Sequence, residues 1–159
     1  MLNLDILLIF IIFVTPSYSN KDELSGHVEC PGTFQIKFTH FSVSPNPIIT
    51  NHSIEFKIGG ISTITIENGT YYSSMTFWKD EPMGFTVQDF CKDWVEPNGG
   101  RCPVAPGEFY YKGRFFKTVA QDEYDPKNVT LTKFARTIIA RPDGHISACI
   151  EGNYTEIYQ

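Results

Sequence analysis

Residues 99–113 read "GGRCPVAPGEFYYKG", and they carry the most specific information about the fold. Two glycines and two prolines surround Cys102, so the chain turns here with little conformational freedom. Aromatic residues follow at once, with Phe109 and Tyr111 at alternate positions. Alternating large side chains are typical of a strand that packs one face against a second layer. The stretch therefore predicts a stiff turn that opens a strand with a bulky apolar face.

The same period-two alternation runs through most of the chain, interrupted by turn residues about every ten positions. No amphipathic helix longer than two turns stands out, so the pattern predicts an all-β sandwich of seven or eight strands. A change of phase at Thr39-His40 predicts a β-bulge or a strand that crosses between sheets. The expected strands are 33–43, 53–58, 62–66, 70–78, 108–119, 129–140 and 145–150, with 85–91 open between a strand and a helical turn.

Two turns predict hairpins. Asn68-Gly69 separates segments 62–66 and 70–78, and Pro142-Asp143-Gly144 separates 129–140 from 145–150. Each pair of segments is therefore expected to lie side by side in one sheet.

The N-terminus carries an apolar run from Ile6 to Val14, too short to span a bilayer, and then small residues at Ser17 and Ser19. We interpret residues 1–19 as a cleaved signal peptide, with a signal anchor or a buried helix as the alternative. Residues 20–159 then form one domain. The expected location is extracellular, or the lumen of the secretory and lysosomal or vacuolar system.

Four cysteines remain after such cleavage, and an even number in an oxidising compartment predicts two disulfides with three possible pairings. Cys91 and Cys102 enclose a short loop rich in turn residues, which favours that pair and leaves Cys30 with Cys149. A zinc site is the rival, but there is no C-x-x-C and the histidines are scattered, so we expect no metal. Four sequons, at Asn51, Asn68, Asn128 and Asn153, are candidate glycosylation sites.

These features together resemble a known family. An early cysteine, "SPNP", "FCKDW", "GGRCPVAPGEF" and the final "PDGHISACIEG" look like the ML lipid-recognition domain, closest to its phosphatidylglycerol/phosphatidylinositol transfer branch, with the Niemann-Pick type C sterol carrier as a cousin. The resemblance covers essentially the whole chain after the signal peptide. One departure is that the third disulfide of the sterol-carrying cousins has no counterpart here.

The resemblance implies an immunoglobulin-like β-sandwich of two antiparallel sheets with an apolar cavity between them, and the pairs Cys91–Cys102 and Cys30–Cys149. It further implies a carrier that transfers phospholipid between membranes, without enzymatic activity or cofactor. Its partners would be the lipid and, transiently, membrane surfaces. The alternatives are a sterol carrier, an accessory protein that presents lipid to a membrane receptor, and a plain adhesion module with a solid sandwich.

Neither catalysis nor nucleic-acid binding has support in the sequence. There is no G-x-S-x-G, H-E-x-x-H, P-loop or dinucleotide fingerprint, and Asp89 and Asp93 lack an accompanying base or metal. The chain is acidic, with a net charge of −5, and its aromatic residues are not interleaved with a basic stripe. We therefore expect a protein that is not an enzyme and has no nucleic-acid partner.

Large apolar side chains are abundant, with thirteen Phe, eight Tyr and two Trp. Composition alone favours a solid core, whereas the resemblance implies a hollow one. In the hollow case we expect "CPVAPG" to form a stiff hinge near the entrance and Phe109 and Tyr111 to begin the wall. The residues expected to line a lipid pocket are Phe34, Ile36, Phe38, Ile54, Phe56, Met75, Phe77, Phe85, Val87, Phe109, Tyr111, Phe115, Leu131, Phe134 and Ile146.

Positive charge is concentrated between Phe109 and Arg141, where seven Lys or Arg accompany three Asp or Glu. These cations are suited to an anionic lipid phosphate or an anionic membrane surface, and solvated strand faces explain them equally well. The head-group candidates are Lys112, Arg114, Lys117 and Arg136.

Overall fold

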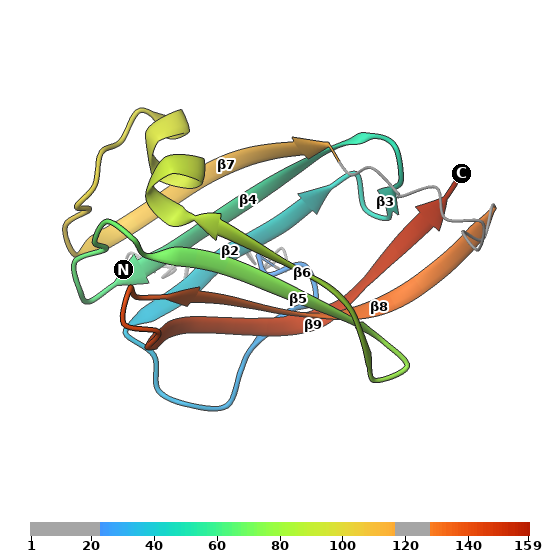
Figure 1. Ribbon diagram of the computed structural model, residues 1–159, viewed down its shortest axis with the longest axis horizontal. Coiled ribbons are helices and arrows are strands. Elements are labelled where there is room, and N and C mark those ends of the chain that lie inside the picture. The colour runs from blue at the N-terminus through green and yellow to red at the C-terminus, as the bar shows by residue number, and fades with distance from the viewer. Residues whose placement is uncertain (1–22, 117–127) are drawn as a thin grey trace, which may run out of the picture.

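Two antiparallel sheets face each other in the computed structural model, which describes residues 23–116 and 128–159 (Figure 1). The predicted signal peptide and Lys117 lie outside the described residues. The elements are β1 (Val28–Glu29), β2 (Ile36–Ser44), β3 (Ile48–Ile49), β4 (Ser53–Ser62), β5 (Tyr71–Trp78), β6 (Glu81–Asp89), the helical turns η1 (Cys91–Val95) and η2 (Glu96–Asn98), β7 (Gly107–Phe116), β8 (Val129–Ala140) and β9 (Ile146–Tyr158).

The larger sheet has the order β1-β9-β8-β5-β6, with β3 running parallel to β9, and the smaller sheet has the order β2-β4-β7. Seven of the strands are eight residues or longer, and β1 and β3 have two residues each. The predicted all-β, immunoglobulin-like sandwich is therefore confirmed. Among the described residues, no helix combines the length and the apolar character that crossing a membrane requires.

Several local predictions are confirmed. The register of β2 against β4 shifts between Phe38 and His40, so of the two predicted alternatives the bulge is present and the crossing between sheets is not. Strands β8 and β9 form the expected hairpin, and the Gly144 amide donates to the Arg141 carbonyl within its turn at 2.9 Å.

The predicted hairpin between 62–66 and 70–78 is wrong. The turn itself forms, because the Thr70 amide donates to the Glu67 carbonyl at 3.1 Å. However, the chain uses it to pass from the smaller sheet, which holds β4, to the larger sheet, which holds β5. Ile66 makes only an isolated bridge to Val104, and β5 pairs with β6 and β8.

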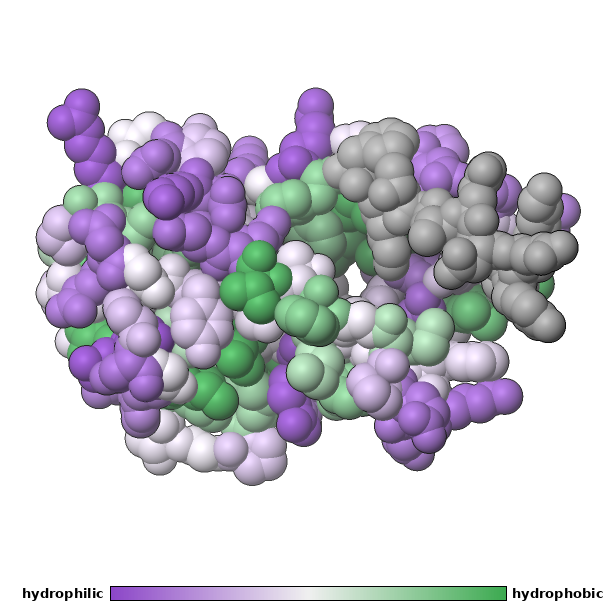
Figure 2. All heavy atoms as spheres, viewed as in Figure 1, coloured by the Kyte–Doolittle hydropathy of each residue, from purple (hydrophilic) through white to green (hydrophobic). Residues whose placement is uncertain are grey.

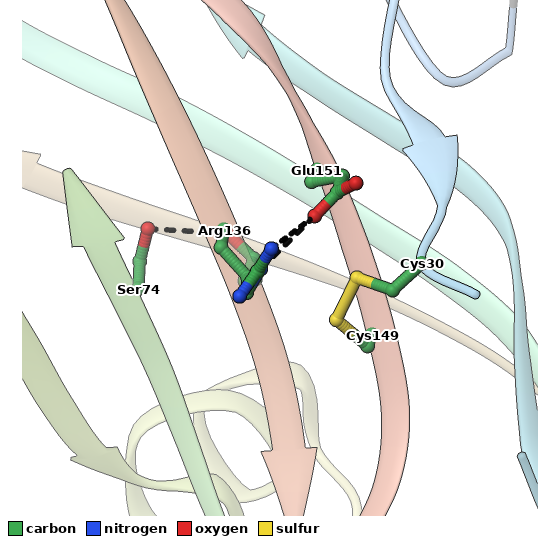
Figure 3. The surroundings of a disulfide bond; sticks show 6 residues. Cys30, Ser74, Arg136, Cys149 and Glu151 are labelled. Atoms are coloured by element: carbon green, nitrogen blue, oxygen red, sulfur yellow. Dashed lines mark hydrogen bonds and ion pairs between the residues drawn. A yellow bond between two sulfur atoms is a disulfide. The ribbon is translucent and has the colours of Figure 1, made fainter. Parts of the chain in front are cut away.

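Both predicted disulfides are present, Cys30–Cys149 and Cys91–Cys102, with Cα–Cα distances of 5.4 and 5.9 Å. Figure 3 shows the first of them joining the segment after β1 to β9. The second closes the segment that contains η1 and η2. The four cysteines thus fix both ends of the domain and one connection between the sheets.

The space between the sheets is divided along the strands into a packed end and a cavity end. At the packed end, large side chains from both sheets interlock with η1 in one cluster. Each long strand of the smaller sheet contributes to both ends: in β4, for example, Ile58 belongs to the cluster and Ile54 lines the cavity. The cluster contains Ile36, Phe38, Phe41, Ile58, Ile66, Tyr72, Phe90, Trp94, Val95, Phe109, Tyr111, Ile139, Ala148 and Ile150.

Candidate functional site

A cavity of about 560 Å³ lies between the two sheets. Its lining comes from β2, β4 and β7 on one side and from β5, β6, β8 and β9 on the other. Figure 2 shows this face of the molecule hollowed near its centre, with hydrophobic residues around the hollow. The volume falls within the range of roughly 300 to 1,000 Å³ that is usual for small-molecule sites. The cavity is thus large enough to hold an organic ligand.

The wall that the smaller sheet provides is apolar. Phe41 and Val43 of β2, Ile54 and Phe56 of β4 and Phe115 of β7 all line the cavity. The rings of Phe56 and Phe115 meet edge to face, with centroids 5.6 Å apart. This wall offers contact area and no hydrogen-bonding side chain among the lining residues that the structure describes.

The opposite wall is formed by small and hydroxylated side chains. Ser74 and Thr76 of β5 lie directly opposite Thr137 and Ala135 of β8 on the inner face of the larger sheet. The Thr137 hydroxyl donates to the Ser74 hydroxyl at 3.1 Å, and the Thr76 hydroxyl donates to the Gly84 carbonyl at 3.3 Å. Four such short side chains leave unfilled the volume that large residues occupy at the packed end. They are the structural cause of the cavity.

The surroundings of two tyrosines on this wall raise the pKa of their hydroxyls. Burial raises the pKa of Tyr72 to about 12, against the smaller opposing effect of hydrogen bonds with Thr137 and Ser74. Burial likewise raises the pKa of Tyr154 to about 12, opposed by a hydrogen bond with Thr76. Both hydroxyls therefore remain hydrogen-bonding groups throughout the physiological pH range.

Trp94 of η1 closes the cavity toward the packed end. Its indole N–H donates to the Gln88 side-chain oxygen at 3.2 Å, and its ring lies 5.1 Å from that of Tyr72. On the other side it contacts Phe115, with centroids 5.6 Å apart. Because Trp94 is completely buried, this end of the cavity is blocked.

A buried polar cluster lies on the wall of the larger sheet, at the end of the cavity away from Trp94. The Lys133 ammonium of β8 donates to the Glu156 carboxylate of β9 at 2.6 Å and also to the Tyr158 hydroxyl. The Tyr158 hydroxyl in turn donates to the same carboxylate oxygen at 2.8 Å. Lys133 and Tyr158 are 5% and 9% exposed and Glu156 is fully buried, so the cluster is held out of bulk water.

The cavity opens along β6, an edge strand of the larger sheet. Met83 and Phe85 both line the cavity and remain 50% and 74% exposed. Met83 and Phe85, which contact both the cavity and the solvent, form an apolar rim at its opening.

Four of the predicted pocket residues line this cavity: Ile54, Phe56, Phe85 and Phe115. Four others, Ile36, Phe38, Phe109 and Tyr111, belong to the packed cluster instead. They share strands with lining residues but lie toward the packed end of the space between the sheets.

The remaining seven predicted pocket residues do not line the cavity. Since Ser74 and Thr76 point inward, the alternate residues of β5 point outward, and the Phe77 ring meets that of Phe134 on the outer face, with centroids 6.0 Å apart. Met75, Val87 and Ile146 are 43%, 56% and 42% exposed. The residues outside the lining are Phe34, Met75, Phe77, Val87, Leu131, Phe134 and Ile146.

The head-group candidates do not gather at one place. Lys112 and Arg114 are exposed on β7, where the Arg114 guanidinium lies 3.8 Å from the Glu55 carboxylate. Arg136 lies on the outer face of the larger sheet and pairs with Glu151 at 2.8 Å (Figure 3). The described candidates are thus divided between two sheets, and each arginine already faces a carboxylate.

The expected hinge at the entrance is also corrected. Val104 bridges to Ile66, and none of the described residues 99–111 lines the cavity. The Cys91–Cys102 disulfide acts instead at the blocked end, since the loop it closes contains Trp94. The four sequon asparagines are all exposed, and their glycosylation stays a prediction.

Sequence reasoning missed the residues that make the site unusual. Ser74, Thr76, Ala135 and Thr137 gave no hydrophobic signal, although their alternate spacing in two strands was visible. Lys133 is a charged residue at an inward position of β8, between Leu131 and Ala135, and this interruption was the available sign of a polar site.

Comparison with solved structures identifies a protein of the same fold. No family model matches the chain, and no curated protein matches it. The crystal structure of a Niemann-Pick type C2 protein from the Japanese carpenter ant is similar, with a TM-score of 0.62 and 18% identity over 83% of this chain and 98% of that chain. Chicken MD-1 complexed with lipid IVa gives a TM-score of 0.46 and 12% identity over 84% of this chain and 98% of that chain. The first likeness shows that this chain has the same immunoglobulin-like sandwich fold.

Proposed function

We infer that this protein binds a lipid between its sheets and carries it between membranes without changing it chemically. The observation that carries the inference is the cavity of about 560 Å³ between the sheets. One of its walls is apolar, the opposite wall consists of short side chains that leave the space open, and the cavity opens at an apolar rim. The fold shared with a Niemann-Pick type C2 protein and the sequence resemblance to the ML family support it. The role is that of a binding protein and not of an enzyme.

Energetics favour exchange over permanent capture. Burying a sixteen-carbon chain is worth at most about 13 kcal/mol relative to water, at about 0.8 kcal/mol per methylene. The same chain is already sheltered in a bilayer, so movement between membrane and cavity is nearly balanced. A carrier of this kind needs neither a metal nor a nucleotide.

Two ligand classes follow from the resemblance, phosphatidylglycerol or phosphatidylinositol and, as the alternative, a sterol. A cationic site at the rim would bind the phosphate of either phospholipid by charge-assisted hydrogen bonds. The described candidates Lys112, Arg114 and Arg136 offer none at the rim, which favours an uncharged lipid. Presentation of the lipid to a receptor is a further possibility, and a stable partner in a pull-down would distinguish it from free transfer.

The setting of this function is the secretory route. Two disulfides are typical of an oxidising compartment, and the exposed sequons are compatible with glycosylation there. Residues 20–159 act as one domain after removal of the signal peptide. The rim residues Met83 and Phe85 make transient contact with the membrane surface during exchange.

Transfer between vesicles tests the proposal. Donor vesicles carry a fluorescent sterol or a fluorescent phosphatidylglycerol, and the secreted protein is added with unlabelled acceptor vesicles. We expect faster transfer of at least one of the two lipids, with the sterol favoured. If neither lipid is transferred or bound, the carrier function is excluded.

A further inference from the structure

The polar cluster of Lys133, Glu156 and Tyr158 is an unusual component for a wall that faces apolar side chains. Its three members line the same cavity as Ile54 and Phe56. Removing two opposite charges from water is costly, and their attraction repays the cost only when the geometry is good and further hydrogen bonds are present. Here the Tyr158 hydroxyl supplies such bonds by donating to Glu156 and accepting from Lys133.

The cluster lies at one end of the cavity, away from Trp94. On β8, Lys133 and Thr137 are four residues apart on the inner face, which corresponds to about 13 Å along the strand. Thr137 is near the blocked end, because its partner Ser74 is two residues from Tyr72 and the Tyr72 ring contacts Trp94. A ligand lying along the strands therefore has one end near the indole and the other near the cluster.

The charge of the cluster restricts the ligand group that it accepts. Among the described members of the cluster, the charges of Lys133 and Glu156 cancel. An added carboxylate or phosphate would lie beside Glu156, and an added ammonium beside Lys133, in surroundings that screen charge poorly. A hydroxyl adds no net charge, and it both donates and accepts, so it can join a network of ammonium, phenol and carboxylate.

We propose that Lys133 and Tyr158, held by Glu156, form a polar anchor that receives the hydroxyl of an uncharged amphiphile whose polar end is buried inside the cavity. This inference rests on the proposed lipid binding and deepens it by naming the ligand class. The apolar part of the ligand lies against Phe41, Val43, Ile54, Phe56 and Phe115.

Three ligands with one chain length test the anchor: octadecanol, its methyl ether, and octadecanoate. Their equilibrium uptake from phosphatidylcholine vesicles by the secreted protein is measured by native mass spectrometry. Octadecanol has the donor that the ether lacks, and octadecanoate has the charge that the anchor disfavours. We expect octadecanol to be taken up about three- to tenfold better than the ether once the vesicle's own preference is subtracted, the effect of one hydrogen bond, and octadecanoate no better than the ether.

Tyr158→Phe is the decisive variant, because it keeps the ring and removes one hydroxyl. It should lower octadecanol uptake by about three- to tenfold and leave uptake of the ether unchanged. Tyr110→Phe is the matched control, since Tyr110 is 48% exposed and does not line the cavity, and its substitution should leave the ratio of alcohol to ether at the wild-type value.

The outcomes separate this inference from the function on which it rests. If none of the three ligands binds, and no other lipid does, the carrier function itself fails. If all three bind equally well to the wild-type protein, or Tyr158→Phe weakens alcohol and ether alike, the cluster is purely structural and the anchor is overturned. The wild-type comparison alone decides the matter if the variant does not fold.

Discussion

Ser73 and Ser74 are neighbouring residues of one kind that point to opposite sides of β5. Ser74 lines the cavity, whereas Ser73 lies on the outer face, opposite Ile138 and Val87. We expect Ser74→Phe to fill the cavity and lower lipid binding by about tenfold or more, since the ring takes the place of the ligand. Ser73→Phe should leave binding at the wild-type level. Equal binding by both variants would show that the ligand lies elsewhere.

The buried pair of Lys133 and Glu156 makes a prediction about stability. Lys133→Met removes the cation beside the Glu156 carboxylate and should lower the free energy of unfolding by about 3 kcal/mol or more. Replacing both, with Lys133→Met and Glu156→Leu, should recover part of this loss, because no unpaired charge remains, although the Tyr158 hydroxyl loses both of its partners. Urea unfolding of the wild type, Lys133→Met and the double variant measures the free energy of unfolding of each. A double variant as unstable as the single one would contradict the prediction.

The raised pKa of Tyr72 predicts that the free energy of unfolding falls at alkaline pH. Its pKa is about 12 in the folded protein and about 10 when unfolded, so the folded state holds the proton more tightly. Its contribution is fully present below pH 10 and is lost as the pH rises from 10 to 12, at up to about 1.4 kcal/mol per pH unit. Urea unfolding across this window should show a shallower decline in Tyr72→Phe. An unchanged decline would mean that the hydroxyl is not buried.

At the scale of elements, β6 combines the position of an edge strand with exposed apolar residues. Pro82 is tolerated because one side of this strand has no partner among the described residues. Val87 is 56% exposed beside the rim but does not line the cavity. Its substitution therefore tests membrane contact separately from ligand binding.

Val87→Asp should slow transfer between vesicles by up to about tenfold, because it places a charge beside the rim that we propose contacts the membrane surface. The amount of lipid that the protein retains at equilibrium should not change. Val28→Asp is the control, since Val28 is 61% exposed on β1 at the other side of the same sheet. If both variants slow transfer equally, β6 has no special role.

Strand β5 also shows why sequence periodicity misjudged the site. Met75 and Phe77 alternate with Ser74 and Thr76, and the hydrophobic pair was expected to face inward. The structure has the reverse, because a wall that leaves space open is built from short side chains. Hydrophobic alternation identifies a strand reliably, but it identifies the inner face only where that face is packed with protein atoms.

For the whole molecule, the fold class, the bulge, the β8–β9 hairpin and the two disulfides were within reach of the sequence. Each depends on residues near in sequence, on the cysteine count or on the family resemblance. The division into a packed end and a cavity end was not accessible in this way. It depends on Ser74 lying opposite Thr137 and on Lys133 reaching Glu156, contacts between positions 63 and 23 residues apart.

Native mass spectrometry of the secreted protein tests most directly whether the space between the sheets holds a lipid. The wild-type protein should carry a bound lipid, Ser74→Phe should carry little or none, and Ser73→Phe should match the wild type. A wild-type protein that emerges empty from lipid-containing medium, and stays empty when mixed with vesicles of sterol and phospholipid, would contradict the account.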